Sequence, residues 1–135
     1  MRATATTTVA ASPERVWAVL ADHEGMAAWG PGLKVSLLRH GPAEPGGVGA
    51  QRSIAMAPLL PPIVEEITAF QPEQRLSYRG VSGIPFRNYA GEVVLRPAGR
   101  GTAISYTVSA DNRLPGVAAV LARGLLFALK RAVSR

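Results

Sequence analysis

Short strand-like segments separated by glycine- and proline-rich turns fill the middle of the chain, and this pattern most limits the possible folds. Six segments fit strands: residues 33–39, 51–56, 63–70, 75–79, 86–96 and 102–110. Clusters of turn residues, such as those in 41–49 and 97–101, separate several of them. Because short turns connect antiparallel neighbours, the pattern predicts a meander of antiparallel strands.

Helical segments flank this meander on both sides. The threonine-rich residues 4–10 fit a first strand, and Ser12 is a good N-cap for a helix over 13–22. A second short helical segment over 23–29 ends at a Gly-Pro-Gly sequence, and a long amphipathic helix is expected over 114–134. Strands flanked by helices predict an α+β fold with helices on one face of an antiparallel sheet.

Length and composition fit one globular domain, residues 1–135, in which 47% of the residues are hydrophobic. The chain has no cysteine, which excludes disulfides, thiolate nucleophiles and cysteine-ligated metals. Its two histidines, His23 and His40, leave little material for another metal site, so we expect no metal and no cofactor. The first residues lack the apolar run of a signal peptide, and cations interrupt the apolar residues 114–133. We therefore expect a cytoplasmic protein.

The net charge of +6 arises from the last third of the chain. Acidic and basic residues balance over 1–92, whereas 93–135 contain seven basic residues and one acid, Asp111. Cations near a helix C-terminus can simply complement the helix dipole, or they can form a surface for a membrane or a protein. The basic residues stand singly without interleaved aromatic residues, so nucleic-acid binding is not expected.

Several segments resemble a known family. Residues 11–22, which begin Ala-Ser-Pro-Glu-Arg-Val-Trp, resemble its opening helix, and 70–79 resemble its central turn. Residues 91–97 and 101–106 resemble its last hairpin. Together they make nearly the whole chain similar to the START-related (SRPBCC) superfamily with the helix-grip fold, and within it to the polyketide cyclase/dehydrase and lipid-transport-like group.

The resemblance implies a curved seven-stranded antiparallel sheet wrapped around the long C-terminal helix, with two short helices after the first strand. It also implies a central cavity between sheet and helix. The expected function is binding of a small hydrophobic ligand, such as a lipid or a polyketide, in that cavity. The alternative is a polyketide cyclase/dehydratase-type enzyme that uses acid/base chemistry there. The sequence leaves open whether the protein is a monomer or a homodimer.

Alternation along the strands divides the polar residues between two faces. The adjacent Glu65 and Glu66 must point to opposite sides, and the phase of the neighbouring isoleucines favours Glu65 inside. Glu92 is expected outside. A buried Glu65 would have a raised pKa unless Arg52 or Arg87 pairs with it.

Candidate ligand contacts are the inward-facing strand residues, a tryptophan near the expected cavity entrance and the apolar side of the terminal helix. They are Trp29, Arg52, Glu65, Tyr78, Arg87, Tyr89, Tyr106, Val117, Leu121 and Leu125. For acid/base chemistry, the candidates are Glu65 or His23 as base and Tyr89, Tyr106, Arg52 or Arg87 as donor. The same residues also fit structural roles: a salt bridge for Glu65, a solvated helix cap for His23 and core positions for the tyrosines.

The terminal helix has two different faces. Apolar residues at a spacing of four should grip the sheet: Val117, Leu121, Leu125, Leu129 and Val133. The water-facing stripe should contain Arg123, Phe127, Lys130 and Arg131, flanked by Leu126. A stripe of this kind suits a peripheral membrane or protein contact, although isolated exposed apolar residues are also normal. Leu59 and Leu60, in a proline-rich loop, are candidates for a hydrophobic lip of the cavity.

Overall fold

The computed structural model describes residues 1–56 and 60–134. Within them the elements follow the order β1 (Arg2–Val9), α1 (Pro13–Ala21), the 3₁₀ helix η1 (Glu24–Trp29), β2 (Lys34–Arg39), β3 (Gln51–Ala55), β4 (Ile63–Gln71), β5 (Arg75–Ser82), β6 (Ala90–Ala98), β7 (Gly101–Ser109) and α2 (Val117–Val133).

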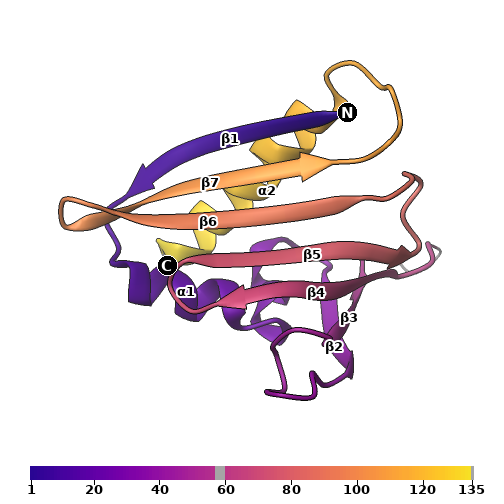
Figure 1. Ribbon diagram of the computed structural model, residues 1–135, viewed down its shortest axis with the longest axis horizontal. Coiled ribbons are helices and arrows are strands. Elements are labelled where there is room, and N and C mark those ends of the chain that lie inside the picture. Colours follow the sequence, from indigo (N-terminus) through magenta and orange to yellow (C-terminus); the bar gives the residue numbers. More distant parts are fainter. Residues whose placement is uncertain (57–59, 135) are drawn as a thin grey trace.

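The seven strands of the described residues form one antiparallel sheet in the order β1-β7-β6-β5-β4-β3-β2 (Figure 1). Strands β2 to β7 are each paired with their neighbours in sequence, which confirms the predicted meander. β1 joins the sheet at the far side, where Arg2 pairs with Ser109 and Val9 pairs with Thr102. The amino group of Met1 strengthens this edge by donating a hydrogen bond to the carbonyl oxygen of Ala110 at 2.7 Å.

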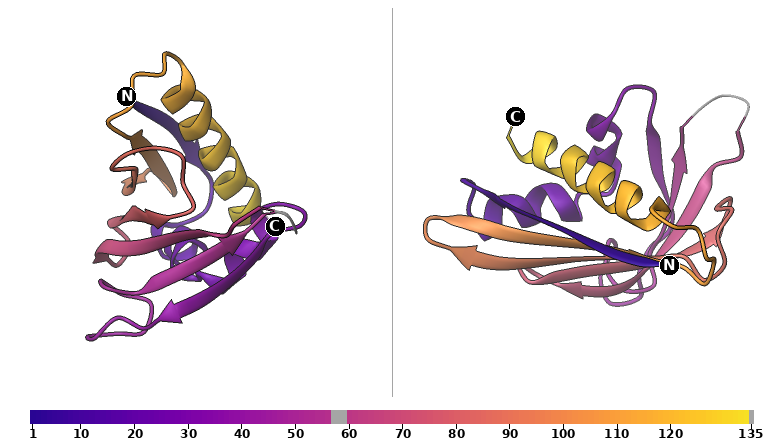
Figure 2. Two further views of the ribbon diagram at one scale, coloured as in Figure 1. Left: turned by 90° about the vertical axis from the view of Figure 1, so that its right-hand side faces the viewer. Right: turned by 90° about the horizontal axis from the view of Figure 1, so that it is seen from above.

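The sheet curves around α2, which lies across its concave side (Figure 2). α2 packs against β1 and β7, and it also contacts α1 and η1. The largest fully buried side chains come from the sheet and from these helices: Tyr106, Ile67, Leu76, Ile104, Leu129, Val16, Val93 and Val108. This arrangement is the predicted α+β helix-grip fold.

Local sequence signals explain where α1 begins and why two other elements begin later than predicted. The Ser12 hydroxyl caps α1 by accepting a hydrogen bond from the Arg15 N–H at 3.2 Å. α2 starts only at Val117 because Gly116, with φ of 80°, interrupts the helical backbone. The strand expected from residue 86 begins at Ala90, because residues 83–89 form a loop in which Asn88 has φ of 51°.

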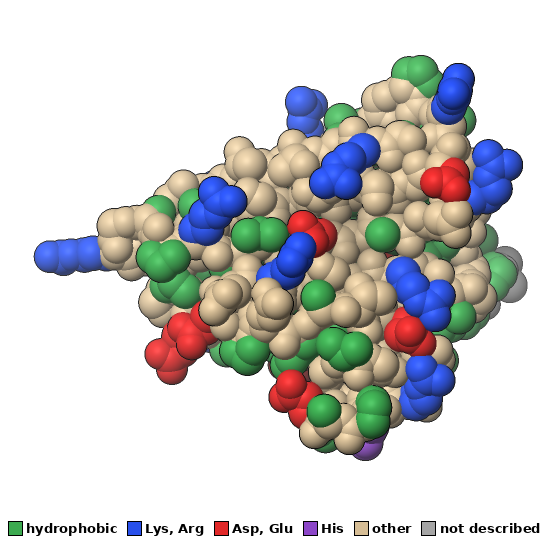
Figure 3. Space-filling model, in the orientation of Figure 1, with side chains coloured by type: hydrophobic (Ala, Val, Ile, Leu, Met, Phe, Trp, Pro, Cys, Tyr) green, Lys and Arg blue, Asp and Glu red, His purple; other side chains and the backbone are tan. Residues whose placement is uncertain are grey.

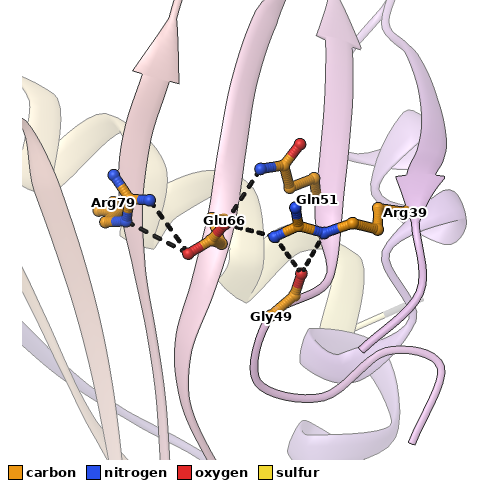
Figure 4. A network of polar contacts seen from close by, with 5 residues as sticks. All are labelled: Arg39, Gly49, Gln51, Glu66 and Arg79. Atoms are coloured by element: carbon orange, nitrogen blue, oxygen red, sulfur yellow. Dashed lines mark hydrogen bonds and ion pairs between the residues drawn. The ribbon is translucent and has the colours of Figure 1, made fainter. Parts of the chain in front are cut away.

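The outer face of the sheet mixes charges of both signs (Figure 3). On this face Glu66 lies between Arg39 and Arg79, at 2.7 and 3.1 Å, and also accepts a hydrogen bond from Gln51 (Figure 4). The hydrogen bond from Gln51 has the largest effect on the pKa of Glu66, and the bond from Arg79 has the next largest. Both hold this pKa below its usual value. The partner of Glu92 is Arg75, at 2.9 Å. Glu66 and Glu92 therefore lie outside the sheet, as predicted.

Candidate functional site

A cavity of about 270 Å³ lies between the inner face of the sheet, η1, the loop before β6 and α2. Its wall is mainly apolar, as in most small-molecule sites. The loop gives Ile84, Pro85, Phe86 and Tyr89, and α2 gives Leu121, Leu125 and Ala128. The remaining wall consists of Met26, Trp29, Leu33, Ile54, Met56, Ile63, Glu65 and Tyr78.

A buried ion pair stands at the wall of this cavity. Arg52 on β3 and Glu65 on β4 are directly opposite each other in the sheet, and both are almost completely buried. Arg52 donates from Nε and Nη2 to the same carboxylate oxygen, Glu65 Oε1, at 3.0 and 2.8 Å. Among the described residues no hydrogen bond reaches Glu65 Oε2. Because Glu65 lines the cavity, this second oxygen is the carboxylate atom left for a ligand.

His23 is the third member of this buried polar group. Its Nε2 lies 2.8 Å from the carbonyl oxygen of Gly46, and its Nδ1 lies 3.1 Å from Arg52 Nη1. The carbonyl can only accept and the guanidinium can only donate, so His23 is neutral with its proton on Nε2. Burial lowers the pKa of His23 below the ordinary 6.5; the Gly46 hydrogen bond opposes this shift, and the Arg52 charge adds to it.

The charges of Arg52 and Glu65 stabilise each other against the cost of burial. Removal from water raises the pKa of Glu65, and the Arg52 guanidinium acts in the opposite direction. Burial, the largest single effect, acts to lower the pKa of Arg52, but the Glu65 carboxylate together with Tyr78 and Tyr106 leaves that pKa raised. The pair is thus a neutral unit with one free acceptor atom.

Two tyrosines extend the polar group into the core. The hydroxyl groups of Tyr78 and Tyr106 lie 2.7 Å apart, and the Arg52 guanidinium lies 5.0 Å from the centre of the Tyr78 ring. Burial raises the pKa of Tyr78 and of Tyr106, so both phenols keep their protons at neutral pH. Tyr89 stands on the cavity wall itself, and burial raises its pKa as well.

Trp29 supplies an unused donor. The residue ends η1, is 6% exposed and lines the cavity. Among the side-chain nitrogens and oxygens of the described residues that are completely shielded from solvent, its indole Nε1 is the one without a hydrogen-bond partner. A buried N–H without an acceptor is costly, so this atom is a natural contact for a polar group of a ligand.

The structure brings most of the predicted site residues together. Those that line the cavity are Trp29, Glu65, Tyr78, Tyr89, Leu121 and Leu125. Glu65 is 5% exposed and therefore faces inward, as the strand phase favoured. Arg52 and Tyr106 lie behind the wall, in contact with Glu65 and Tyr78 respectively.

The structure places several other residues differently from the expectation. Arg87 is exposed, because it lies in the loop before β6, where its backbone N–H donates to Asn112 Oδ1 at 2.7 Å. Val117 is half-buried in the first turn of α2, away from the cavity. His23 is buried and hydrogen-bonded, so it is not a solvated cap, and with both ring nitrogens engaged it is not a free base. Leu126 is buried and does not flank a water-facing stripe.

Some wall residues escaped the sequence analysis, although a signal for them exists. Ile84 and Phe86 flank a proline in a segment that the alternation assigned partly to a strand. Large apolar residues in a loop indicate that the loop folds over the core. Met26 precedes Trp29 by three residues, which places both on the same side of a 3₁₀ helix.

The outer side of α2 agrees with the predicted basic stripe. Phe127 is 62% exposed, and Arg123, Lys130 and Arg131 are exposed beside it. Leu60 is also exposed, whereas Leu59, the other residue of the expected lip, lies outside the described residues. In the described part of the chain no helix is long and apolar enough to span a bilayer, and no three metal-ligating side chains come together.

Comparison with known protein families assigns this architecture. A family model described as "Polyketide cyclase / dehydrase and lipid transport" matches residues 1–135. The chain belongs to this family. The START-related resemblance of its sequence is thereby confirmed. A comparison with curated proteins gave no match.

Solved structures show the same fold. A START superfamily protein from Mycobacterium smegmatis has a TM-score of 0.76 at 16% identity, covering 98% of this chain and 97% of that one. The protein TTHA0849 from Thermus thermophilus has a TM-score of 0.75 at 21% identity, with coverages of 99% and 97%. Ara h 8.0201 has a TM-score of 0.75 at 15% identity, with coverages of 98% and 94%. At sequence identities this low, these structures show that the fold is shared. They do not show the function of this chain.

Proposed function

We propose that this SRPBCC-family protein binds a small hydrophobic molecule in the cavity between the sheet and α2. The observation that carries the proposal is the mainly apolar cavity wall with a few polar side chains, Glu65 and Trp29 among them. This combination is typical of sites that hold an apolar body and orient it through a few polar contacts.

The cavity volume limits the size of the ligand. A cavity of roughly 150 Å³ can hold benzene. The 270 Å³ available here is a little less than twice that volume, which suits a molecule of about two fused rings. A sterol or a two-chain lipid would need the loop before β6 or α2 to move outward.

Filling the cavity tests this proposal. Ala128 of α2 lines the cavity, and Ala128→Phe would place a ring inside it. We expect wild-type protein to increase the emission of the neutral two-ring dye prodan, and the variant to bind the dye at least about tenfold more weakly. Val120→Phe, at an exposed position of the same helix, is the matched control. Equal binding by wild type and Ala128→Phe would overturn the proposed location.

The alternative is an acid/base enzyme that uses the same cavity. It is favoured by Glu65, whose raised pKa and unpartnered Oε2 suit a base that removes a proton from carbon. His23 and Tyr106 do not line the cavity and would act only through Arg52 and Tyr78. An enzyme of this kind would accelerate deuterium exchange next to the carbonyl of 2-tetralone, and Glu65→Gln would abolish the acceleration in folded protein.

The outer side of α2 supports a second role, contact with an anionic membrane surface. Val120 and Phe127 are 69% and 62% exposed and lie one above the other on the helix. Three cations flank them, and residues 112–135 contain no acidic residue, in contrast to the mixed charges of the outer sheet face. Exposed apolar residues between cations fit the boundary between lipid headgroups and acyl chains.

Vesicle sedimentation tests the membrane contact. Vesicles that contain phosphatidylserine should retain the protein at low salt and release it at high salt, whereas phosphatidylcholine vesicles should not bind it. Phe127→Ser should weaken retention several-fold, and Leu38→Ser, at an exposed apolar position of β2, should not. Retention independent of lipid charge, or absent from both vesicles, would contradict this role.

A further inference from the structure

The polar atoms of the cavity wall indicate which functional groups a ligand needs in addition to an apolar body. We propose that the cavity selects a neutral two-ring molecule that carries both a hydrogen-bond donor and a hydrogen-bond acceptor, such as a hydroxylated bicyclic ketone. This inference rests on the proposed function, since it names the class of ligand for the same cavity.

The need for an acceptor comes from Trp29. An indole N–H can only donate, and Trp29 Nε1 has no partner although the residue is only 6% exposed. In the same part of the described chain, the His23 ring, the Arg52 guanidinium and the Tyr78 and Tyr106 hydroxyls all have hydrogen-bond partners. A carbonyl or ether oxygen on the ligand would satisfy this atom.

The need for a donor comes from Glu65. An ionised carboxylate can only accept, and both hydrogen bonds from Arg52 converge on Oε1. Oε2 thus keeps acceptor capacity, and Glu65 lines a cavity whose other contributions are mainly apolar. A hydroxyl group on the ligand would donate to it, and the burial of Glu65 would strengthen that bond.

The need for neutrality comes from the balance of buried charge. Arg52 and Glu65 cancel each other at 2.8 Å, and the hydrogen bonds of His23 require its neutral form. No described charge next to the cavity remains to compensate a charged ligand. A carboxylate ligand would also meet the negative Glu65, so fatty acids and similar anions should be rejected.

A matched series of naphthalenes tests this selection by calorimetry. The compounds are 6-acetyl-2-naphthol with donor and acceptor, 2-acetylnaphthalene with an acceptor alone, 2-methylnaphthalene with neither, and the anion 6-hydroxy-2-naphthoate. We expect affinity to fall about tenfold for each polar group removed, and the anion to bind most weakly.

Trp29→Phe provides the matched change in the protein. It removes the N–H but keeps an aromatic ring, so it should weaken both acetyl compounds about tenfold and leave 2-methylnaphthalene unchanged. Trp17→Phe is the control, because Trp17 packs on Phe70, with ring centres 5.0 Å apart, and does not line the cavity.

The outcomes separate this inference from the proposed function. If 2-methylnaphthalene binds as tightly as 6-acetyl-2-naphthol, or if the anion binds best, the selection is wrong while binding of an apolar molecule stands. If Trp29→Phe affects all neutral compounds equally, the N–H is not a ligand contact and the acceptor requirement is overturned. If none of the compounds binds, the proposed function fails at this cavity, and the inference fails with it.

Discussion

Arg52 and Glu65 show how two charges can persist inside a small apolar protein. They face each other across β3 and β4, and the guanidinium also lies over the Tyr78 ring. Removing either partner leaves the other as an uncompensated buried charge, which is costly. The pair therefore stabilises the fold only as a unit, while it places Glu65 Oε2 at the cavity.

We predict that Arg52→Met lowers the free energy of unfolding by about 3–5 kcal/mol, because it leaves the Glu65 carboxylate buried alone. The double variant Arg52→Met/Glu65→Leu should recover most of this loss. Arg79→Met should cost less than about 1 kcal/mol, since Arg79 pairs with Glu66 on the outer face of the sheet. Urea denaturation measures all three, and a double variant as unstable as the single one would contradict the account.

We predict that protonation of His23 destabilises the folded protein. Its folded pKa lies below the unfolded value near 6.5, so the unfolded state binds more protons in this window. Stability should therefore fall as pH drops from about 6.5 to the lowered folded pKa. His23→Gln cannot titrate and should remove this part of the slope, which is at most about 1.4 kcal/mol per pH unit.

The control for this experiment is the other histidine. His40 is exposed at the end of β2, so His40→Gln should keep the wild-type slope. The free energy of unfolding is measured at several pH values for wild type, His23→Gln and His40→Gln. This comparison separates the contribution of His23 from that of the carboxylates. If His23→Gln keeps the wild-type slope, then the neutral His23 ring with its two hydrogen bonds does not contribute to the pH dependence of stability.

At the scale of elements, two glycines have opposite roles. Gly91 of β6 lies opposite Tyr78 of β5, and a side chain there would overlap the Tyr78 ring. Gly124 lies in the exposed part of α2, with open space around it. The first glycine makes room for the tyrosine pair, whereas the second only weakens the helix.

We predict that Gly91→Ala destabilises the protein by about 1–3 kcal/mol, because the Tyr78 hydroxyl would lose its position beside Tyr106. Gly124→Ala should stabilise it by about 0.5–1 kcal/mol, because alanine is the better helix former. Thermal and urea unfolding would show both effects. Changes of the same sign in the two variants would contradict the assigned roles.

The sequence predicts the elements better than the details of the cavity. Strand alternation is a local signal, so it placed Glu65 inside and Glu66 outside without knowledge of the fold. It failed at Arg87, because Asn88 leaves the strand conformation and resets the phase. The state of His23 depends on Gly46 and Arg52, which are distant in sequence, so local patterns do not reveal it.

At the scale of the whole molecule, charge is divided by face. On the outer side of the sheet, Arg39 and Arg79 pair with Glu66, and Arg75 pairs with Glu92. The outer side of α2 carries cations, and residues 112–135 contain no acidic residue. Two sides of one small domain therefore differ in charge, while the cavity lies between the sheet and the helix.

The pairing of β1 with β7 also sets the order of events during synthesis. The ribosome makes β1 first, but its partner in the sheet spans Gly101–Ser109, so β1 must wait until most of the chain has emerged. The local hairpins from β2 to β7 can form earlier, because their loop closures are shorter. Because α2 follows β7 in the chain and packs against both β1 and β7, this edge of the sheet is completed only when nearly all of these residues are available.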